Sequence, residues 1–161
     1  MSYPVVVKVT RDTIDQFKNK FMLKEYPNID VSMIAYKNGD VYIGQQIKEK
    51  RNGLGTMYYE NGDVQISNWY NDIADGCGVL EKKDGTRYLG RWRDGKLHWT
   101  KNQIQFKDGT LYEGSLINGE LTGKGTMLYS NGDVYKGEWK KGKWHGEGAV
   151  KYTNGEIYKG G

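Results

Sequence analysis

Short stretches in which apolar and polar residues alternate follow one another along most of the chain. In the clearest of them Tyr135, Gly137 and Trp139 share one side of an extended strand, while the charged residues between them share the other side. A second alternating stretch, GEGAVKY at 146–152, follows after a short polar segment that contains Gly142. A period of two interrupted by glycine turns predicts a β-hairpin rather than an amphipathic helix.

An Asn-Gly or Asp-Gly pair separates these hairpins at regular intervals. Its glycines are 23, 23, 24, 23 and 23 residues apart. Asn-Gly between alternating strands is the strongest short-range hairpin signal, because both residues adopt positive φ at low cost. The six pairs are Asn38-Gly39, Asn61-Gly62, Asp84-Gly85, Asp108-Gly109, Asn131-Gly132 and Asn154-Gly155.

This spacing predicts a repeat array of hairpins. The complete units lie near 38–60, 61–83, 84–107, 108–130 and 131–153. A partial unit follows at 154–161, and a degenerate half-unit precedes them at 28–37, so the array covers 28–161. The predicted fold is mainly β, a single-layer antiparallel hairpin solenoid with a small N-terminal strand–helix cap.

Glycine within the strands needs a physical reason, because glycine normally weakens a strand. Each first strand carries aromatic, glycine and aromatic residues in turn on one face. We therefore expect a large ring from a neighbouring position to lie over the bare glycine backbone. The sheet should then curve into a trough with tyrosine and tryptophan rings stacked along its inside.

The repeated pattern Y-x-G-x-W-x-x-G-x-x-x-G-x-G resembles the MORN repeat (membrane occupation and recognition nexus), and residues 135–148 carry it in full. The resemblance covers about 38–161. It implies the hairpin-array fold, and in larger family members the chemistry belongs to an appended domain. The third unit departs from the pattern: it lacks the Gly-x-Gly pair, and residues 97–102 are one residue longer. We expect a bulge there, where His98 and Trp99 form either a special contact site or part of a drifted repeat.

Composition agrees with strands and aromatic packing, with 23 Gly, 13 Tyr and 5 Trp but only 2 Pro. The net charge of +4 is too small and too evenly spread to predict nucleic-acid binding. A single cysteine, Cys77, excludes an internal disulfide and a cysteine-based zinc site. The sequence shows neither a membrane-spanning run nor a signal peptide, which predicts a cytoplasmic location, at a membrane or cytoskeletal surface.

The two ends of the sequence differ from the repeats. Residues 1–27 predict a strand at Val5–Val9 and a helix from Thr10 or Asp12 to about Tyr26, with an apolar stripe that includes Phe17. This segment either caps the first strand of the sheet or docks a partner. The partial unit at the C-terminus predicts an open sheet edge, which would form a homodimer or pair with a partner.

No residue pattern predicts catalysis, a metal site or a cofactor. His98 and His145 occupy the same phase two units apart, about 20 Å in a sheet, which is too far for a shared metal ion. The aspartates that follow the turn glycines are expected to stabilise turns, because the closely spaced glycine pattern of calcium-binding repeats is absent. Gly-x-Gly pairs precede strands rather than helices, so no nucleotide site is predicted. We expect a non-enzymatic protein.

The first functional hypothesis is a scaffold that binds a helix or extended peptide of another protein in the aromatic-lined trough. Aromatic side chains give large contact areas at a small entropic cost, and they also form the structural core here. The predicted groove residues are Tyr42, Trp69, Tyr88, Trp92, Trp99, Tyr112, Tyr135, Trp139 and Tyr158.

The alternative hypothesis is peripheral association with anionic phospholipids, which the family name implies. Lysines near the C-terminus would supply the attraction, at about 1 kcal/mol each. Glutamates lie among them, so an ordinary solvated face is the simpler interpretation. A glycan-binding role is the least favoured, since such repeats are exported and differ in phase. The lysines in question are Lys136, Lys140, Lys141, Lys143 and Lys151.

Overall fold

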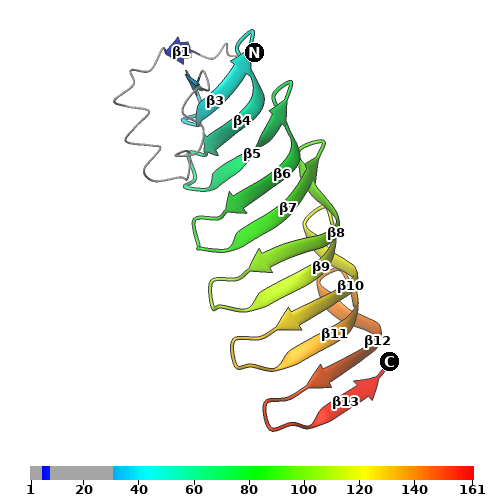
Figure 1. Ribbon diagram of the computed structural model, residues 1–161. Helices are drawn as coiled ribbons and strands as arrows, with labels where there is room; N and C mark the ends of the chain where they lie inside the picture. The colour runs from blue at the N-terminus through cyan, green and yellow to red at the C-terminus, as the bar shows by residue number, and fades with distance from the viewer. Residues whose placement is uncertain (1–4, 8–30) are drawn as a thin grey trace.

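The protein folds into one antiparallel sheet whose strands follow each other in chain order. The computed structural model describes the backbone of residues 5–7 and 31–161 and the side chains of 31–97 and 102–161. In this part each strand is hydrogen-bonded to the next, so the sheet is a continuous ladder of 13 strands (Figure 1). They are β1 (Val5–Val7), β2 (Ser32–Ala35), β3 (Val41–Ile47), β4 (Lys50–Tyr58), β5 (Val64–Tyr70), β6 (Ile73–Glu81), β7 (Arg87–Arg93), β8 (Lys96–Gln105), β9 (Leu111–Ile117), β10 (Glu120–Leu128), β11 (Val134–Lys140), β12 (Lys143–Lys151) and β13 (Ile157–Gly160).

The single-layer hairpin array predicted from the sequence is confirmed by this topology. The first part of the predicted strand Val5–Val9 is also confirmed, because Val6 pairs with Ile34 of β2. The helix expected between Thr10 and Tyr26 lies outside the described residues. No helix in the described part of the chain is long and apolar enough to span a bilayer.

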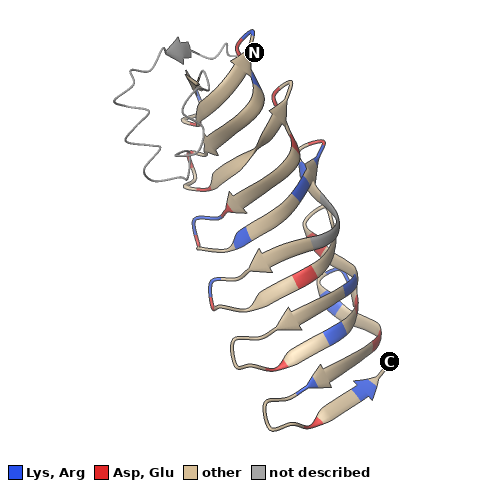
Figure 2. Ribbon diagram, in the orientation of Figure 1, with Lys and Arg blue, Asp and Glu red and all other residues tan. Residues whose placement is uncertain are grey.

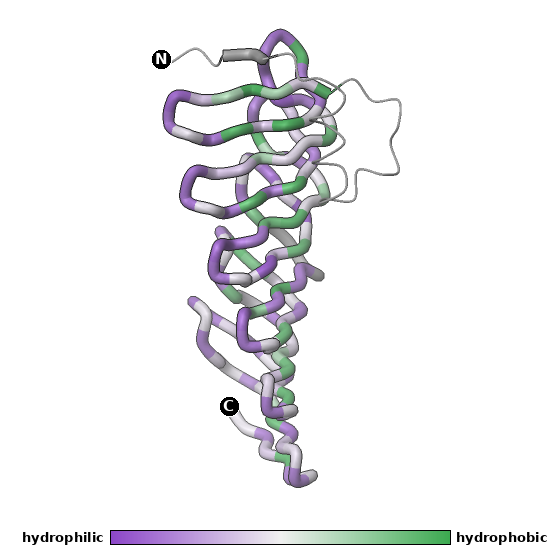
Figure 3. The backbone as a smooth tube through the Cα atoms, turned by 90° about the vertical axis from the view of Figure 1, so that its left-hand side faces the viewer, coloured by the Kyte–Doolittle hydropathy of each residue, from purple (hydrophilic) through white to green (hydrophobic). Residues whose placement is uncertain are grey.

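Two kinds of turn connect the strands, and both rely on positive φ. The Asn-Gly turns between units place glycine in the left-handed region, as at Gly132 with φ of 93°. The turns within hairpins use two successive left-handed residues, as at Lys141 (51°) and Gly142 (75°), which is the type I′ geometry that matches strand twist. Figure 3 shows hydrophilic residues gathered at these turns.

In four of the five hairpins, all except β7–β8, the second strand bends where a glycine interrupts the ladder. Gly53, Gly76, Gly123 and Gly146 have φ between 57° and 106°, and the register shifts within these hairpins lie beside them. The bend lets a hairpin turn bond to the preceding hairpin, as when Gly142 N donates to Leu121 O at 3.1 Å. Successive hairpins are therefore joined at their turns as well as along the strands.

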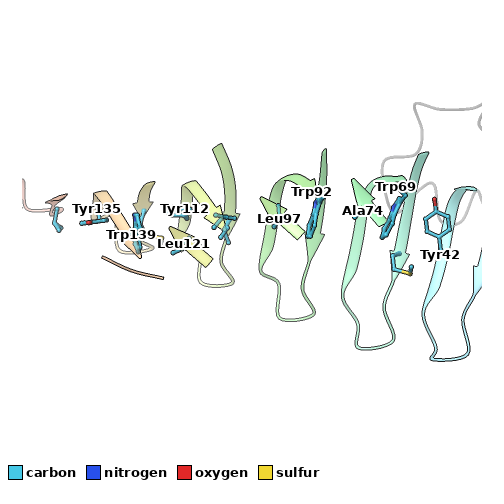
Figure 4. Packing of buried hydrophobic residues seen from close by; sticks show 14 of the residues in the cluster. Tyr42, Trp69, Ala74, Trp92, Leu97, Tyr112, Leu121, Tyr135 and Trp139 are labelled. Carbon is cyan, nitrogen blue, oxygen red and sulfur yellow. The ribbon is translucent and has the colours of Figure 1, made fainter. Parts of the chain in front are cut away.

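The core lies on one face of the sheet, here called the inner face, and the opposite face is the outer face. Directly paired residues continue it from strand to strand, as in the row Ile34, Tyr42 and Met57, which are 0%, 0% and 1% exposed. Figure 4 shows tyrosine and tryptophan rings from successive hairpins following one another along this face. The core is thus a line of side chains rather than a central cluster.

The repeat tyrosines explain the glycines of the second strands. A Cβ on Gly55 would overlap the ring of Tyr42, and the Tyr42 hydroxyl donates to Gln45 O at 2.6 Å. Tyr112 lies over Gly125 in the same way. The prediction that a ring lies over bare glycine backbone is therefore confirmed.

The third unit carries the expected irregularity. Between Trp99 and Asn102 the strand β8 has one residue more than β9 has between its paired residues Leu116 and Gly114. Asn102 stands where the other units have the second glycine, and it is 1% exposed. The side chains of His98 and Trp99 lie outside the described set, so the choice between a contact site and a drifted repeat stays open.

Candidate functional site

Most of the rings predicted to line a groove form the core instead of an open surface. Trp69, Trp92 and Trp139 are 5%, 7% and 4% exposed, and Tyr42, Tyr112 and Tyr135 are equally buried. Tyr88 is partly exposed, whereas Tyr158 is 62% exposed. The side chain of Trp99 is outside the described set. These rings therefore act mainly as the structural core, a role that the sequence also indicated, and not as the lining of an open groove.

The buried rings hold neighbouring hairpins together. Trp139 contacts Tyr112 and Tyr135 edge to face, at 5.5 and 5.1 Å between ring centroids, and its Nε1 donates to Gly125 O at 3.2 Å. Trp69 repeats this arrangement three hairpins earlier, with its Nε1 bonded to Gly55 O at 3.0 Å. Each tryptophan thus bridges two hairpins, and a partner could not displace it without disrupting the array.

A second set of aromatic residues on the inner face is more accessible. They lie three residues before the turn glycines; all but one pack against the edge of the core and are partly exposed, and the exception, Tyr152, is 39% exposed. These residues were not predicted from the sequence, although their constant offset from Asn-Gly or Asp-Gly is a usable signal. We call them the aromatic row: Tyr36, Tyr59, Phe106, Tyr129 and Tyr152.

Charged groups close the N-terminal part of this row. Arg51 lies over the rings of Tyr36 and Trp69, at 5.6 and 4.6 Å from the centroids, and bonds to Asp72. In the second unit Lys82 takes the aromatic position and bonds to the buried Asp63. Burial of Asp63 opposes its ionisation, but hydrogen bonds from Lys82 and from the Lys83 backbone outweigh this and hold the pKa of the carboxyl below its usual range.

Two hollows lie on the C-terminal part of the inner face, and the row lines the first of them. One of about 590 Å³ lies between Phe106 and Tyr129, with Met127 in its lining. The other, of about 270 Å³, is lined by Tyr135, Trp144 and Tyr158 among others.

Trp144 presents a ring beside the second hollow. It is 49% exposed, stacks on Tyr135 at 4.3 Å, and donates from Nε1 to the Tyr129 hydroxyl at 3.0 Å. Its ring is therefore held in one orientation while about half of its surface faces solvent. Such a pre-ordered ring loses little entropy when another molecule covers it.

Comparison with known families agrees with this geometry. The MORN repeat model matches residues 42–64, 66–87, 88–98, 112–134 and 135–157. The chain belongs to the MORN-repeat family. The matched segments begin at or near the repeat tyrosines, and the segment at 88–98 stops where the third unit loses its glycines.

Comparison with solved structures found TCP domains at low sequence identity. The TCP10 domain of CPAP from Danio rerio has 18% sequence identity and a TM-score of 0.50, over 81% of the MORN chain and 62% of the domain. The MORN chain thus spans less than two thirds of that domain. The TCP domain of SAS-4 from Drosophila melanogaster, solved with a proline-rich motif of Ana2, has 16% identity and a TM-score of 0.36, over 80% and 82%. The similarity to the CPAP domain is a similarity of fold.

The turn aspartates of the MORN array act as predicted, as structural residues. Asp40 Oδ1 accepts a hydrogen bond from Glu60 N at 2.9 Å, and Asp133 Oδ1 accepts one from Thr153 N at 2.9 Å. Each carboxylate thereby joins its own turn to the start of the next. Among the described side chains no three His, Cys, Asp or Glu residues are grouped so that they could hold a metal ion.

The lysines considered for lipid contact divide between two places. Lys136 and Lys151 point from the strands to the outer face, opposite the aromatic row, whereas Lys140, Lys141 and Lys143 lie at the turn between β11 and β12. All five are exposed.

Proposed function

We propose that this MORN array is a non-enzymatic module that binds a segment of another protein along the C-terminal part of the aromatic row. The observation that carries the proposal is the pair of hollows flanked by Phe106, Tyr129 and Trp144. These rings are anchored by the core on one edge and open on the other. Partly exposed aromatic rings supply contact area at a small entropic cost, which is typical of binding hot spots.

The repeat spacing suits an extended peptide. Two strands per unit at about 4.8 Å place equivalent residues of successive units about 10 Å apart. An extended chain in the polyproline II conformation has three residues per turn and advances about 3.1 Å per residue, so every third side chain would meet the next ring. Phe106, Tyr129 and Tyr152 would contact three such side chains in succession.

A peptide selection tests this proposal. Random peptides displayed on phage are selected against the purified full chain, and the affinity of the best peptide is measured by calorimetry. We expect Tyr129→Ala and Tyr152→Ala each to weaken binding about tenfold, the ordinary effect of losing a hot-spot ring. Tyr70→Ala is the matched control, because Tyr70 is 68% exposed on the outer face. Equal losses in the control, or none in the row variants, would refute the site.

Salt separates the protein-binding proposal from lipid association. Peptide binding by the row should persist at about 0.5 M salt, whereas attraction to anionic vesicles should vanish there. Vesicle binding at low salt that Lys136→Glu and Lys151→Glu abolish, in a protein that selects no peptide, would favour the membrane alternative.

The homodimer through the C-terminal edge stays a separate proposal. Ile157 and Tyr158 of β13 are 60% and 62% exposed, so two such strands present apolar side chains beside their backbone groups. Light scattering across a concentration series measures the mass directly. A constant monomer mass at high micromolar concentration would contradict the dimer.

A further inference from the structure

One line of residues across the outer face changes character halfway along the array. The residue after each repeat tyrosine position lies on this face, and pairing continues the line, as Ile66 pairs with Val79 and Val79 with Leu89. In the first three units this residue is aliphatic, and in the later units it is charged. The residues are Ile43, Ile66 and Leu89, followed by Glu113, Lys136 and Lys159.

Figure 2 shows how charged residues are distributed along the ribbon. The strands β3 to β6 are almost free of charged residues, whereas β7, β9, β11 and β13 carry blue or red bands. The fold does not require aliphatic residues at this register, because Glu113 and Lys136 occupy it in regular hairpins. Ile43 is 3% exposed and therefore already buried, but Ile66 and Leu89 stay partly exposed, so these two aliphatic residues need another explanation.

A hollow of about 660 Å³ marks the apolar half of the outer face. Its lining includes Leu54 of β4, Ile66 of β5, Val79 of β6 and Leu89 of β7, all partly exposed. These four residues cross four adjacent strands along the array axis. The surface is thus an open apolar strip.

Arginines border this strip on one side. Arg87, Arg91 and Arg93 alternate with inner-face residues on β7, so they share the outer face with Leu89. Glu81 lies 3.4 Å from Arg87, whereas the exposed Arg91 lines the hollow itself. A second copy stacked face to face would bring these arginines together, so the charge favours an acidic partner over self-association.

We propose that the outer face of β4–β7 docks an amphipathic helix of a partner protein, with an aliphatic stripe against the strip and acidic residues beside Arg91. Strands about 4.8 Å apart nearly match the 5.4 Å pitch of an α-helix. Three strand intervals from Leu54 to Leu89 span about 14 Å, which about ten helical residues cover. This surface lies opposite the aromatic row, so the two sites are independent.

The test uses two synthetic helical peptides of about 18 residues, both with leucine on one stripe. Glutamates flank the stripe in the first peptide, and lysines flank it in the second. Fluorescence anisotropy of the labelled peptides measures their affinity for the full chain. We expect the glutamate peptide to bind at least tenfold more tightly than the lysine peptide.

Substitutions that copy other units keep the fold intact in this test. Leu89→Glu reproduces the residue at Glu113, and Arg91→Glu reproduces the one at Glu138, in the same register. Leu89→Glu should weaken binding of the glutamate peptide at least tenfold, and Arg91→Glu should reverse the preference between the two peptides. Lys136→Glu, at the register of Leu89 but in the fifth unit, is the matched control and should change neither affinity.

Cys77 reports where the peptide binds, because it is the single cysteine of the chain and lines the hollow. The glutamate peptide should slow alkylation of Cys77 at least tenfold. The proposal is overturned if both peptides bind equally, if Lys136→Glu weakens binding as much as Leu89→Glu, or if Cys77 stays reactive in the complex. Binding of anionic vesicles in place of either peptide would also overturn it.

Discussion

The hairpins β11–β12 and β7–β8 follow the same repeat pattern, but only β11–β12 carries all of its residues. In the first, Tyr135 is 3% exposed, lies over Gly148 and donates from its hydroxyl to Glu138 O at 2.9 Å. In the second, Asn102 stands at the glycine position and Tyr88 is partly exposed. A Cβ on Gly90 would overlap the amide oxygen of Asn102, so the amide occupies space that a tyrosine ring fills elsewhere.

The difference shows that ring and glycine form one packing unit. When the glycine is lost, the ring loses its place, and another side chain fills the gap. The ladder nevertheless continues through β8 with one extra residue. Backbone pairing is therefore separable from ring packing.

The largest effect should come from Gly148→Ala. The new Cβ would lie 2.5 Å from the Tyr135 hydroxyl and 2.7 Å from a ring carbon, so the ring must move. We expect a loss of about 3 kcal/mol in unfolding free energy, the upper range for overpacking, measured by urea denaturation. Gly142→Ala is the control: it meets no atom within 4 Å and should cost only about 1 kcal/mol through its positive φ. Equal costs would contradict the coupling of ring and glycine.

Alkaline pH should unfold the regular hairpins through their buried tyrosines. Burial raises the pKa of Tyr112 to about 12, and it also raises the pKa of Tyr135. The folded state then keeps the phenol proton more tightly than the unfolded chain, whose tyrosines titrate near pH 10. Stability should be unchanged up to about pH 10 and fall as the pH rises towards 12, by up to about 1.4 kcal/mol per pH unit for each such tyrosine. Denaturation curves at pH 9 and 11 with equal midpoints would refute this.

The tryptophans of the two hairpins should respond differently to phenylalanine. Trp139→Phe removes the hydrogen bond to Gly125 O at 3.2 Å, whereas Trp92 Nε1 is buried without a partner. We expect Trp139→Phe to cost about 1 kcal/mol more than Trp92→Phe, measured by urea denaturation of the two variants. An equal or larger cost for Trp92→Phe would contradict a stabilising role for the hydrogen bond from Trp139.

The turn residues should give the smallest contrast. Asp133→Ala removes the bond to Thr153 N at 2.9 Å and should lower the melting temperature by about 3 °C, which corresponds to about 1 kcal/mol. The third unit has Thr86 at this position, and Thr86→Ala should cost less because the Thr86 side chain bonds to Asp84 within its own turn, whereas the Asp133 carboxylate also joins the next turn. Calorimetry of both variants measures the difference, and a reversed order would contradict it.

The repeat pattern was enough to predict the ladder, its turns and the irregular third unit. Tyrosine, glycine and Asn-Gly at fixed offsets define local geometry, and local geometry determines a sheet in which each strand pairs with its sequence neighbour. The ring over Gly55 could be predicted for the same reason, because a glycine within a strand leaves space for a neighbouring ring.

The accessible surfaces could not be predicted in the same way. Tyr42 and Tyr129 are the same residue type, yet one is fully buried and the other lines a hollow. Accessibility depends on how the bent second strand and the next hairpin cover each ring, which alternation does not reveal. The aliphatic strip around Leu89 was not predicted because it lies at a repeat position whose residue type differs between units. The repeat pattern is defined by the positions that the units share.

The hydrogen bonds between units connect register-equivalent atoms, as when Asp40 accepts from Glu60 N and Asp133 accepts from Thr153 N, both 20 residues ahead. If a gene lost or duplicated one unit in frame, each remaining turn would find an equivalent acceptor and donor in its new neighbour. The array can therefore change length during evolution by recombination between its own repeats, without a new packing problem. Copies made in this way can then diverge on the face that the core does not constrain.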